Sequence, residues 1–381
     1  MRKIAVVTGT RAEYGPLKPL MTAIEKDKTL TLIPIITGMH LLPEYGNTYK
    51  LVEKDFSNSV KIPMSLEGDG LRDMALYLSA GIKNFANYFS QHPPDIVIVT
   101  GDRSEQLAVA LAALYLNIPI AHINGGDVSG GMIDESIRHA ITKIAHVHLA
   151  YTKQNAERIN KMGEDTHKIY VTGAIAIEAI LQMKLKSKKE LFKTHHLNPD
   201  KTTFLVVQHP ITLLKDRGYA QYQELLRALD VLREQTILAY PNCDAGSKKL
   251  ISLLKKYEHR SYLNMFKNIP HEDYVGFMKY VNVMIGNSSS GIIEAPTLKT
   301  PVINIGDRQQ GRDRSDNIID IEPKKDKILE AVHFILNDKA FKNKLKKCKN
   351  KYGEGKASKK IVHILKNIKI DEKFIRKQIT Y

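Results

Sequence analysis

Four acidic side chains follow two neighbouring apolar runs of this sequence, in positions where they could carry proton transfer. The four are Asp102, Asp127, Asp134 and Glu135. The runs, residues 96–99 and 118–123, are typical of buried parallel strands. Parallel strands bring the side chains after their carboxyl ends to one rim of the sheet, where α/β folds bind ligands. Bringing several carboxylates together at one rim costs free energy through charge repulsion unless they are paired or take part in chemistry. We therefore predict a catalytic site at this edge of the sheet.

The charged and imidazole side chains at this rim also allow structural interpretations. Asp102 and Arg103 could form a surface ion pair, although a position directly after a buried strand favours chemistry. Arg138 lies four residues after Asp134, so these two could form a salt bridge on a helix surface. His122 could equally be a hydrogen-bonded histidine of the core. The spacing alone leaves these alternatives open.

The start of the chain predicts a strand, a turn and a helix that could hold an anion. Residues 3–8 are apolar, a turn containing Gly9 and Arg11 follows, and a helical pattern continues to about residue 25. The first turn of a helix favours anions, because its free N–H groups and its dipole point at them. The glycine spacing matches neither a dinucleotide-binding fingerprint nor a Walker loop, so neither NAD nor ATP binding is predicted.

A serine-rich turn in the second half of the chain could bind the diphosphate of a nucleotide. Residues 286–291 lie between an apolar run and a helix, so their hydroxyls and N–H groups could hold phosphate. Glu294, one turn into the helix that follows this motif, could accept from ribose hydroxyls. Arg308, which follows the next strand, could pair with a phosphate through its guanidinium. The candidates at this and three other strand ends are Gly286, Ser288, Ser289, Glu294, Arg308, His209, Asn242 and Asp244. The alternative is that the serines cap a helix and the others form turns.

Strand and helix patterns alternate through two halves of similar size. We predict one doubly wound domain over residues 1–172 and a second, nucleotide-binding domain over residues 173–355. Residues 356–381 form a basic helical tail that could pack back on the first domain. The predicted fold is therefore α/β, with two Rossmann-like doubly wound domains facing a central cleft. This architecture resembles that of glycosyltransferases of the B type.

Composition excludes several classes of protein. The net charge is +16, and the excess lies in the second half of the chain, mostly as lysine without interleaved aromatic residues. This pattern favours a solvated helical tail over a surface for nucleic acid or membrane. Two cysteines make neither a disulfide framework nor a zinc-ligand spacing, so we expect a reducing cytoplasm and no structural metal. We see no secretory leader, and no apolar run approaches the roughly 18 residues of a membrane span.

The ordered set of motifs resembles the hydrolysing UDP-N-acetylglucosamine 2-epimerases of sialic and related nonulosonic acid biosynthesis. The matching stretches are residues 8–14, 101–103, 125–127, 133–143, 208–210, 241–242, 244–247, 285–291 and 301–312. Each stretch is weak evidence by itself. Together they occur in order and extend over about residues 1–320, which makes the resemblance specific.

The resemblance implies a two-step reaction on a UDP-sugar that needs neither metal nor NAD. A base removes the proton from sugar C2 while UDP leaves C1, and water then adds to the resulting glycal with opposite configuration at C2, releasing N-acetylmannosamine. Asp102 and Asp134 are implied to be the catalytic acid/base groups. The implied substrate contacts are Arg103, His40, His209, His122, Arg138, Arg11, Asn242, Asp244, Ser288, Ser289, Glu294 and Arg308. Relatives usually form dimers or tetramers, so a homo-oligomer is expected.

The sequence departs from the resemblance at Asn124, where many members carry glutamate. Asparagine cannot exchange a proton near neutral pH. Either Asp127 shares the acid/base role, or the substrate is another nucleotide-activated amino sugar, such as a UDP-2,4-diacetamido sugar. A longer loop at residues 130–132 adds weight to the second alternative. A non-hydrolysing UDP-N-acetylglucosamine 2-epimerase or a retaining glycosyltransferase would have the same architecture.

Overall fold

A computed structural model describes residues 1–43, 46–65, 68, 70–129, 133–209, 215–241, 247–267 and 269–380. The described chain folds into two compact units. Unit 1 comprises residues 1–127, 133–181 and 352–381, and unit 2 comprises residues 128–132 and 182–351. Each unit is built on one parallel β-sheet with helices on both faces. The predicted α/β class with two doubly wound, Rossmann-like sheets is therefore confirmed.

The described part of unit 1 contains a seven-stranded sheet in the order β3-β2-β1-β4-β5-β6-β7. The strands are β1 (Arg2–Thr8), β2 (Leu30–Ile36), β3 (Val60–Lys61), β4 (Ile96–Thr100), β5 (Ile120–Ile123), β6 (Val147–Ala150) and β7 (Ile169–Val171). The central strands are mostly apolar and buried because helices cover both of their faces. The strand order reverses between β1 and β4, and such a switch point is where open α/β sheets bind ligands.

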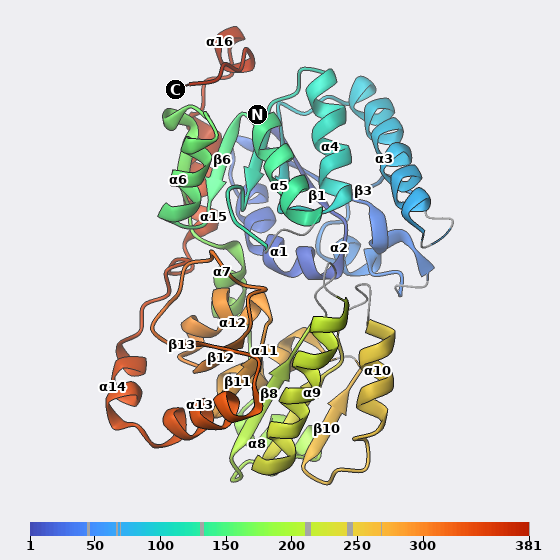
Figure 1. Cartoon of the computed structure of the whole chain (residues 1–381). Helices are drawn as coiled ribbons and strands as arrows, with labels where there is room; N and C mark the ends of the chain where they lie inside the picture. Colours follow the sequence, from blue (N-terminus) through green and yellow to red (C-terminus); the bar gives the residue numbers. More distant parts are fainter. Residues whose placement is uncertain are drawn as a thin grey trace. The chain divides into compact units, whose positions relative to one another are not determined.

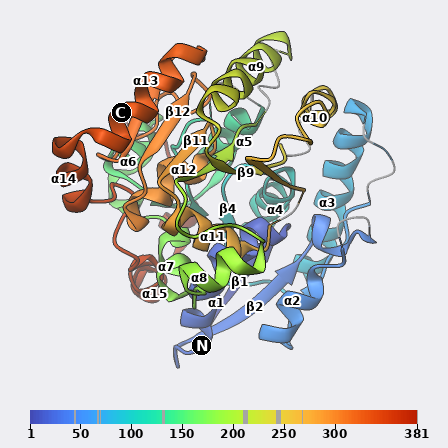
Figure 2. The same cartoon turned by 90° about the horizontal axis from the view of Figure 1, so that it is seen from below.

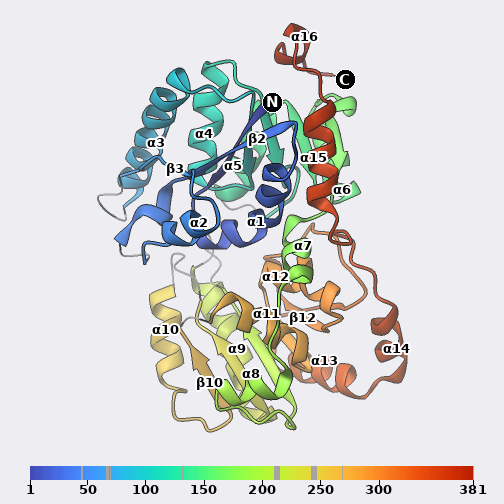
Figure 3. The ribbon, with the colours of Figure 1, turned by 180° about the vertical axis from the view of Figure 1, so that it is seen from behind.

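Helices cover both faces of the sheet of unit 1. They are α1 (Arg11–Glu25), α2 (Tyr49–Asp55), α3 (Leu71–Gln91), α4 (Ser104–Tyr115), α5 (Ile133–Ile144), α6 (Lys153–Lys161), α7 (Ile175–Gln182), α15 (Ala357–Asn367) and α16 (Glu372–Ile375), with short 3₁₀ turns η1 (Gly38–Leu41) and η3 (Thr166–Lys168). Helices α3, α4 and α5 lie on one face (Figure 1), and α1, α2 and α15 lie on the other (Figure 3). Helices α3 and α4 approach closely because Gly81 faces Ala108, where a Cβ would come within 2.8 Å.

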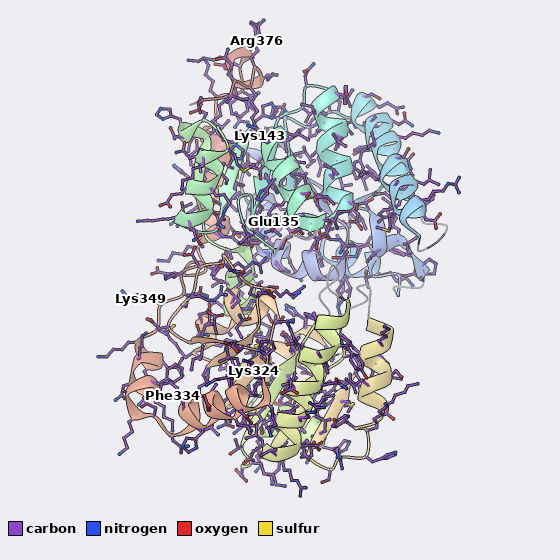
Figure 4. All side chains as sticks on the ribbon, in the orientation of Figure 1. Glu135, Lys143, Lys324, Phe334, Lys349 and Arg376 are labelled. Atoms are coloured by element: carbon purple, nitrogen blue, oxygen red, sulfur yellow. The ribbon has the colours of Figure 1, made fainter. Side chains whose placement is uncertain are left out.

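The basic end of the chain returns to unit 1 and fixes two of its helices. Helix α15 packs beside α1, as Figures 2 and 3 both show. Further on, the Lys377 ammonium donates to the carbonyls of Lys143, at 2.5 Å, and Ala145, at 2.7 Å, and it pairs with the Glu164 carboxylate. Lys377 thus caps the carboxyl end of α5, whose first turn holds Glu135 (Figure 4).

Unit 2 is built on six parallel strands, as far as the structure describes it, in the order β10-β9-β8-β11-β12-β13. The strands are β8 (Thr203–Val207), β9 (Gln235–Ala239), β10 (Leu263–Phe266), β11 (Val283–Gly286), β12 (Val302–Ile305) and β13 (Ile318–Ile321). The order reverses between β8 and β11, which makes their carboxyl ends the second switch point of the chain.

The helices of unit 2 form two apolar layers on this sheet. They are α8 (Lys188–Thr194), α9 (Lys215–Leu232), α10 (Ser247–Lys255), α11 (His271–Tyr280), α12 (Ser289–Ile293), η4 (Ala295–Leu298), α13 (Lys325–Asn337) and α14 (Lys339–Lys347). One core lies under α9, α10 and α13, and the other lies under α8, α11 and η4. No helix within the described residues of either unit is long and apolar enough to cross a membrane.

Candidate active site

A buried guanidinium joins two of the predicted catalytic carboxylates at the switch point of unit 1. Arg138, on α5, pairs with Asp102 after β4 and lies 3.0 Å from the carboxylate of Asp127 after β5. Asp127 has no exposed surface and Arg138 is 2% exposed, whereas the side chain of Asp102 is 23% exposed. One cation between two carboxylates offsets their mutual repulsion and fixes their directions. Asp102 is the member of the group that reaches the surface.

Tight turns after β4 and β5 bring these side chains together. Gly101, Asn124 and Gly126 have φ angles of +72°, +65° and +69°, in the left-handed region that glycine and asparagine tolerate. A Cβ on Gly126 would lie 2.4 Å from the carbonyl oxygen of Asn155, so only glycine fits there. The Asn155 amide in turn donates to the carbonyl of Gly126 at 3.2 Å. The Gly125-Gly126-Asp127 motif is therefore a geometric requirement for burying Asp127.

His122 holds the turn that carries Asp102 through a hydrogen bond to the backbone of Gly101. Its Nε2 lies 2.8 Å from the carbonyl oxygen of Gly101, which can only accept, so Nε2 carries the proton. Burial lowers the pKa of His122 to about 3, so Nδ1 is free to accept from the Thr142 hydroxyl at 3.2 Å. His122 has no exposed surface. His122 thus positions the turn of Asp102, and its predicted contact with substrate stays a prediction.

A second polar cluster lies beside this group, and sequence reasoning identified only part of it. Arg103 contacts the carboxylate of Glu105 at 3.2 and 3.3 Å, and Tyr77 donates to the same carboxylate at 2.8 Å. The Glu13 carboxylate accepts from the N–H of Gly9 at 2.8 Å. Burial, with a further contribution from the charge of Glu105, raises the pKa of Glu13 to about 7. Arg103 thus turns toward Glu105, and Glu13 can hold a proton near neutral pH.

The remaining predicted residues of unit 1 differ in accessibility. Arg11 is exposed at the first residue of α1. Asp134 is partly exposed in the first turn of α5, and His139 lies 3.8 Å from Glu135 one turn further on.

His40 is fully buried, with Nε2 3.0 Å from the Thr8 hydroxyl and Nδ1 2.8 Å from that of Thr48. Burial lowers the pKa of His40 to about 4, and its two hydrogen bonds hold the turn after β2; its predicted ligand contact stays a prediction.

Asn287 joins three strand ends at the switch point of unit 2. Its Oδ1 accepts from the N–H of His209 at 2.7 Å and its Nδ2 donates to the carbonyl of His209 at 3.0 Å. Its own carbonyl accepts from Arg308 at 3.1 Å and from Gln309 at 2.8 Å. Asn287 has no exposed surface. Through its side chain and its backbone carbonyl, this one residue therefore fixes the residues that follow β8, β11 and β12.

The neighbouring Gly286 can be replaced by no larger residue. Its φ is +139°, and a Cβ there would lie 2.1 Å from the carbonyl oxygen of Val207. We expect Gly286→Ala to lower the free energy of unfolding of unit 2 by about 3 kcal/mol, from backbone strain and overpacking together. Denaturant unfolding followed by circular dichroism measures this. Gly46→Ala is the matched control, since Gly46 also has a positive φ, +86°, but no atom of a described residue would lie within 4 Å of its added Cβ. Equal effects of the two substitutions would contradict the packing argument.

The serine-rich turn carries a hydrogen-bonded chain of hydroxyls. The Tyr274 and Ser290 hydroxyls lie 2.6 Å apart, and those of Ser290 and Ser288 lie 2.8 Å apart. Ser288 caps α12 by accepting from the N–H of Ser290, while Ser289 is partly exposed. Burial raises the pKa of Glu294 to about 7, so its carboxyl can donate or accept near neutral pH. The turn thus presents oriented hydroxyls, and the capping alternative is also realised.

Cations and polar groups surround the other strand ends of unit 2. Burial, helped by the charge of Arg308, lowers the pKa of His209 to about 4, which keeps this imidazole neutral. Arg312 donates to the carbonyl of Val128 at 2.8 Å.

The predicted residues Asn242 and Asp244 lie outside the described residues. Within the part of the chain that the structure describes, no group of three His, Cys, Asp or Glu side chains could hold a metal ion.

Comparison with known proteins decides the family. The model of the UDP-N-acetylglucosamine 2-epimerase family matches residues 22–366. The chain belongs to this family. It is similar to the "UDP-N,N'-diacetylbacillosamine 2-epimerase (hydrolyzing)" of Legionella pneumophila, with 35% identity over 100% of both chains. It is also 39% identical to the "GDP/UDP-N,N'-diacetylbacillosamine 2-epimerase (hydrolyzing)" of Campylobacter jejuni, over 84% of each chain.

A solved structure of another UDP-N-acetylglucosamine 2-epimerase supports the fold. The Neisseria meningitidis enzyme, crystallised with UDP-GlcNAc, matches with a TM-score of 0.81 at 20% identity, over 95% of this chain and 99% of that one. Identity this low shows the fold alone. The predicted resemblance to 2-epimerases and to the B-type glycosyltransferase fold is confirmed by these matches together.

Several polar residues of this family member escaped the sequence analysis, although motifs contained or adjoined them. Asn287 stands in the serine-rich motif, but only Gly286, the serines and the backbone N–H groups of that motif were considered as ligands. Gln106 acts similarly in unit 1, where it accepts from the N–H of Thr100 at 3.2 Å and donates to the carbonyl of Val7 at 3.3 Å. The available signal was an amide side chain shortly after a strand end. A carboxamide can accept from one backbone N–H and donate to another backbone carbonyl at the same time, which a carboxylate cannot do because it only accepts.

Proposed function

We propose that this chain is a hydrolysing 2-epimerase that converts a UDP-activated 2,4-diacetamido sugar and water into UDP and the free 2-epimeric sugar. The observation that carries the proposal is the Asp102–Arg138–Asp127 group, with one partly exposed carboxylate, at a sheet switch point of an epimerase-family chain. The choice of sugar is supported by the two relatives named for diacetylbacillosamine. Asn124, which replaces the expected glutamate, supports the same choice.

In the proposed reaction, Asp102 removes the proton from sugar C2. The electron pair of the C2–H bond forms the C1=C2 bond of a glycal, while the C1–O bond breaks and its electrons leave with UDP. Water then bonds to C1 and loses a proton, while the electron pair of the C1=C2 bond takes up a proton at C2 on the opposite face; Asp134 participates in these two proton transfers. Arg138 orients Asp102 through its ion pair, and Asp127 holds Arg138. Because Asp127 is fully buried, we propose this positioning role for it in place of the predicted catalytic one.

Unit 2 is proposed to bind the nucleotide. The partly exposed Ser288 and Ser289 and the backbone N–H groups at residues 286–291 suit a diphosphate, and the Arg308 guanidinium suits a phosphate charge. Glu294, with a pKa of about 7, suits ribose hydroxyls as donor or acceptor. The further proposed substrate contacts are Arg11, Arg103, His209, Ser288, Ser289, Asn242 and Asp244. We also expect a homo-oligomer and a cytoplasmic location.

Product analysis tests the proposal. The protein is incubated separately with UDP-N,N'-diacetylbacillosamine and with UDP-GlcNAc, and the products are identified by proton and phosphorus NMR. We expect free sugar epimerised at C2 together with UDP, and a higher kcat/KM for the diacetamido substrate. UDP-GlcNAc is the second candidate substrate, because the family is named for it. An epimer still attached to UDP would show a non-hydrolysing enzyme, and sugar transferred to an acceptor would show a glycosyltransferase.

A further inference from the structure

Two buried polar atoms at neighbouring strand ends have no hydrogen-bond partner among the described residues: Asn124 Oδ1 and Thr100 Oγ1. Thr100 ends β4 and lies beside Ile123 in the parallel register, and Asn124 directly follows Ile123. The backbone of Asn124 is fixed, since its N–H donates to the carbonyl of Leu149 at 3.1 Å and its φ is +65°. The carboxamide therefore projects from a rigid turn with its oxygen unsatisfied.

These two atoms belong to the two strand ends that also carry the proposed catalytic group. Thr100 stands two residues before Asp102, and Asn124 stands three residues before Asp127, whose partner Arg138 pairs with Asp102. Folded proteins hydrogen-bond nearly all of their buried polar atoms, so an unsatisfied pair at a sheet switch point calls for a ligand group. The ligand group must supply a donor to the Asn124 oxygen.

We propose that the Asn124 carboxamide, assisted by the Thr100 hydroxyl, binds the acetamido group at C4 of the sugar and so selects a diacetamido substrate. This inference rests on the proposed function. An acetamido group offers one N–H donor and one C=O acceptor, and a carboxamide offers the complementary acceptor and donors. A carboxylate in the same place could accept from a C4 hydroxyl but could not donate to an acetamido carbonyl. Because asparagine does not exchange a proton near neutral pH, Asn124 acts in binding.

The test compares Asn124→Gly with the wild-type protein on UDP-N,N'-diacetylbacillosamine and on UDP-GlcNAc. Glycine accepts a φ of +65° without strain, so the substitution removes the carboxamide and leaves the turn in place. Asn117→Gly is the matched control, because Asn117 is an exposed residue of the same unit with a φ of +54°. Thermal unfolding of both variants shows whether the fold is retained.

We expect Asn124→Gly to lower kcat/KM for the diacetamido substrate by about 10- to 100-fold, mainly through KM, as the loss of two hydrogen bonds predicts. The same substitution should change kcat/KM for UDP-GlcNAc by less than about 3-fold, which is within the effect of losing one weak contact. Asn117→Gly should leave kcat/KM for both substrates unchanged. An equal loss on both substrates, or no loss on either, would overturn the inference while leaving the proposed function intact. Inactivity of the wild-type protein on both would overturn the proposed function and the inference with it.

Discussion

Asp102→Asn is expected to abolish the reaction while the protein stays folded. Asparagine has the shape of aspartate and can still accept from Arg138, but it cannot take a proton from C2. Removing a general base lowers rates by about 10²- to 10⁴-fold, so kcat should fall by that factor. UDP affinity should change by less than about 2-fold, because the proposed nucleotide contacts are mostly neutral hydrogen bonds and phosphate pairs of unit 2. Steady-state release of UDP and calorimetric titration with UDP measure the two quantities.

Asp95→Asn provides the matched control for Asp102→Asn. Asp95 is an exposed carboxylate at the opposite, amino end of the same strand, where it accepts from the N–H of Lys3 at 2.7 Å. Its replacement should leave kcat unchanged. If Asp102→Asn kept kcat within about 5-fold of the wild-type value, the loss would be too small for a general base, and Asp102 could not hold that role.

Arg138→Leu is expected to lower both stability and catalytic rate, because it removes the cation beside the buried carboxylate of Asp127. Asp127 has no exposed surface and would keep its carboxylate without the guanidinium 3.0 Å away. Removing one partner of a buried ion pair costs about 3–5 kcal/mol, so the free energy of unfolding of unit 1 should fall by that amount. Asp102 would also lose the contact that orients it, and turnover should disappear. Denaturant unfolding and steady-state kinetics measure these effects.

A second substitution separates the two consequences. Arg138→Leu combined with Asp127→Asn also removes the buried carboxylate, so part of the lost stability should return. Turnover should stay absent. Arg227→Leu is the control, since Arg227 belongs to an exposed pair with Glu224 and should cost less than about 1 kcal/mol. If Arg138→Leu cost no more than this control, the buried group would not have the energetic role that its geometry indicates.

Local pattern was sufficient to predict the elements that carry the site. The apolar runs at residues 96–99 and 118–123 became β4 and β5, because strands covered on both faces need a continuous apolar sequence. The strand at residues 318–321 was not predicted. Its sequence is a four-residue run interrupted by Asp320, and a run this short cannot be told from a loop by periodicity. Residues 173–193 form two helices, α7 and α8, because Ser187 caps a new helix.

The partners of the charged side chains were not predictable from spacing. Arg138 follows Asp134 at a helix-pair spacing, yet its guanidinium is buried against Asp102 and Asp127, which lie 36 and 11 residues away in the sequence. Likewise Arg103 follows Asp102 directly but contacts Glu105. Turns with positive φ set these pairings, and they decide which carboxylate is exposed. Sequence could therefore identify the set of polar residues at the rim, but only the fold separates Asp102, which reaches the surface, from Asp127, which does not.

Turnover in heavy water tests most directly whether the C2–H bond breaks and UDP leaves before water adds. We expect free 2-epimeric sugar in which every molecule carries one deuterium at C2, with UDP released in equal amount. The isotope at C2 and the configuration there are both read by NMR. Free sugar that keeps its original hydrogen or its original configuration at C2 would contradict the account.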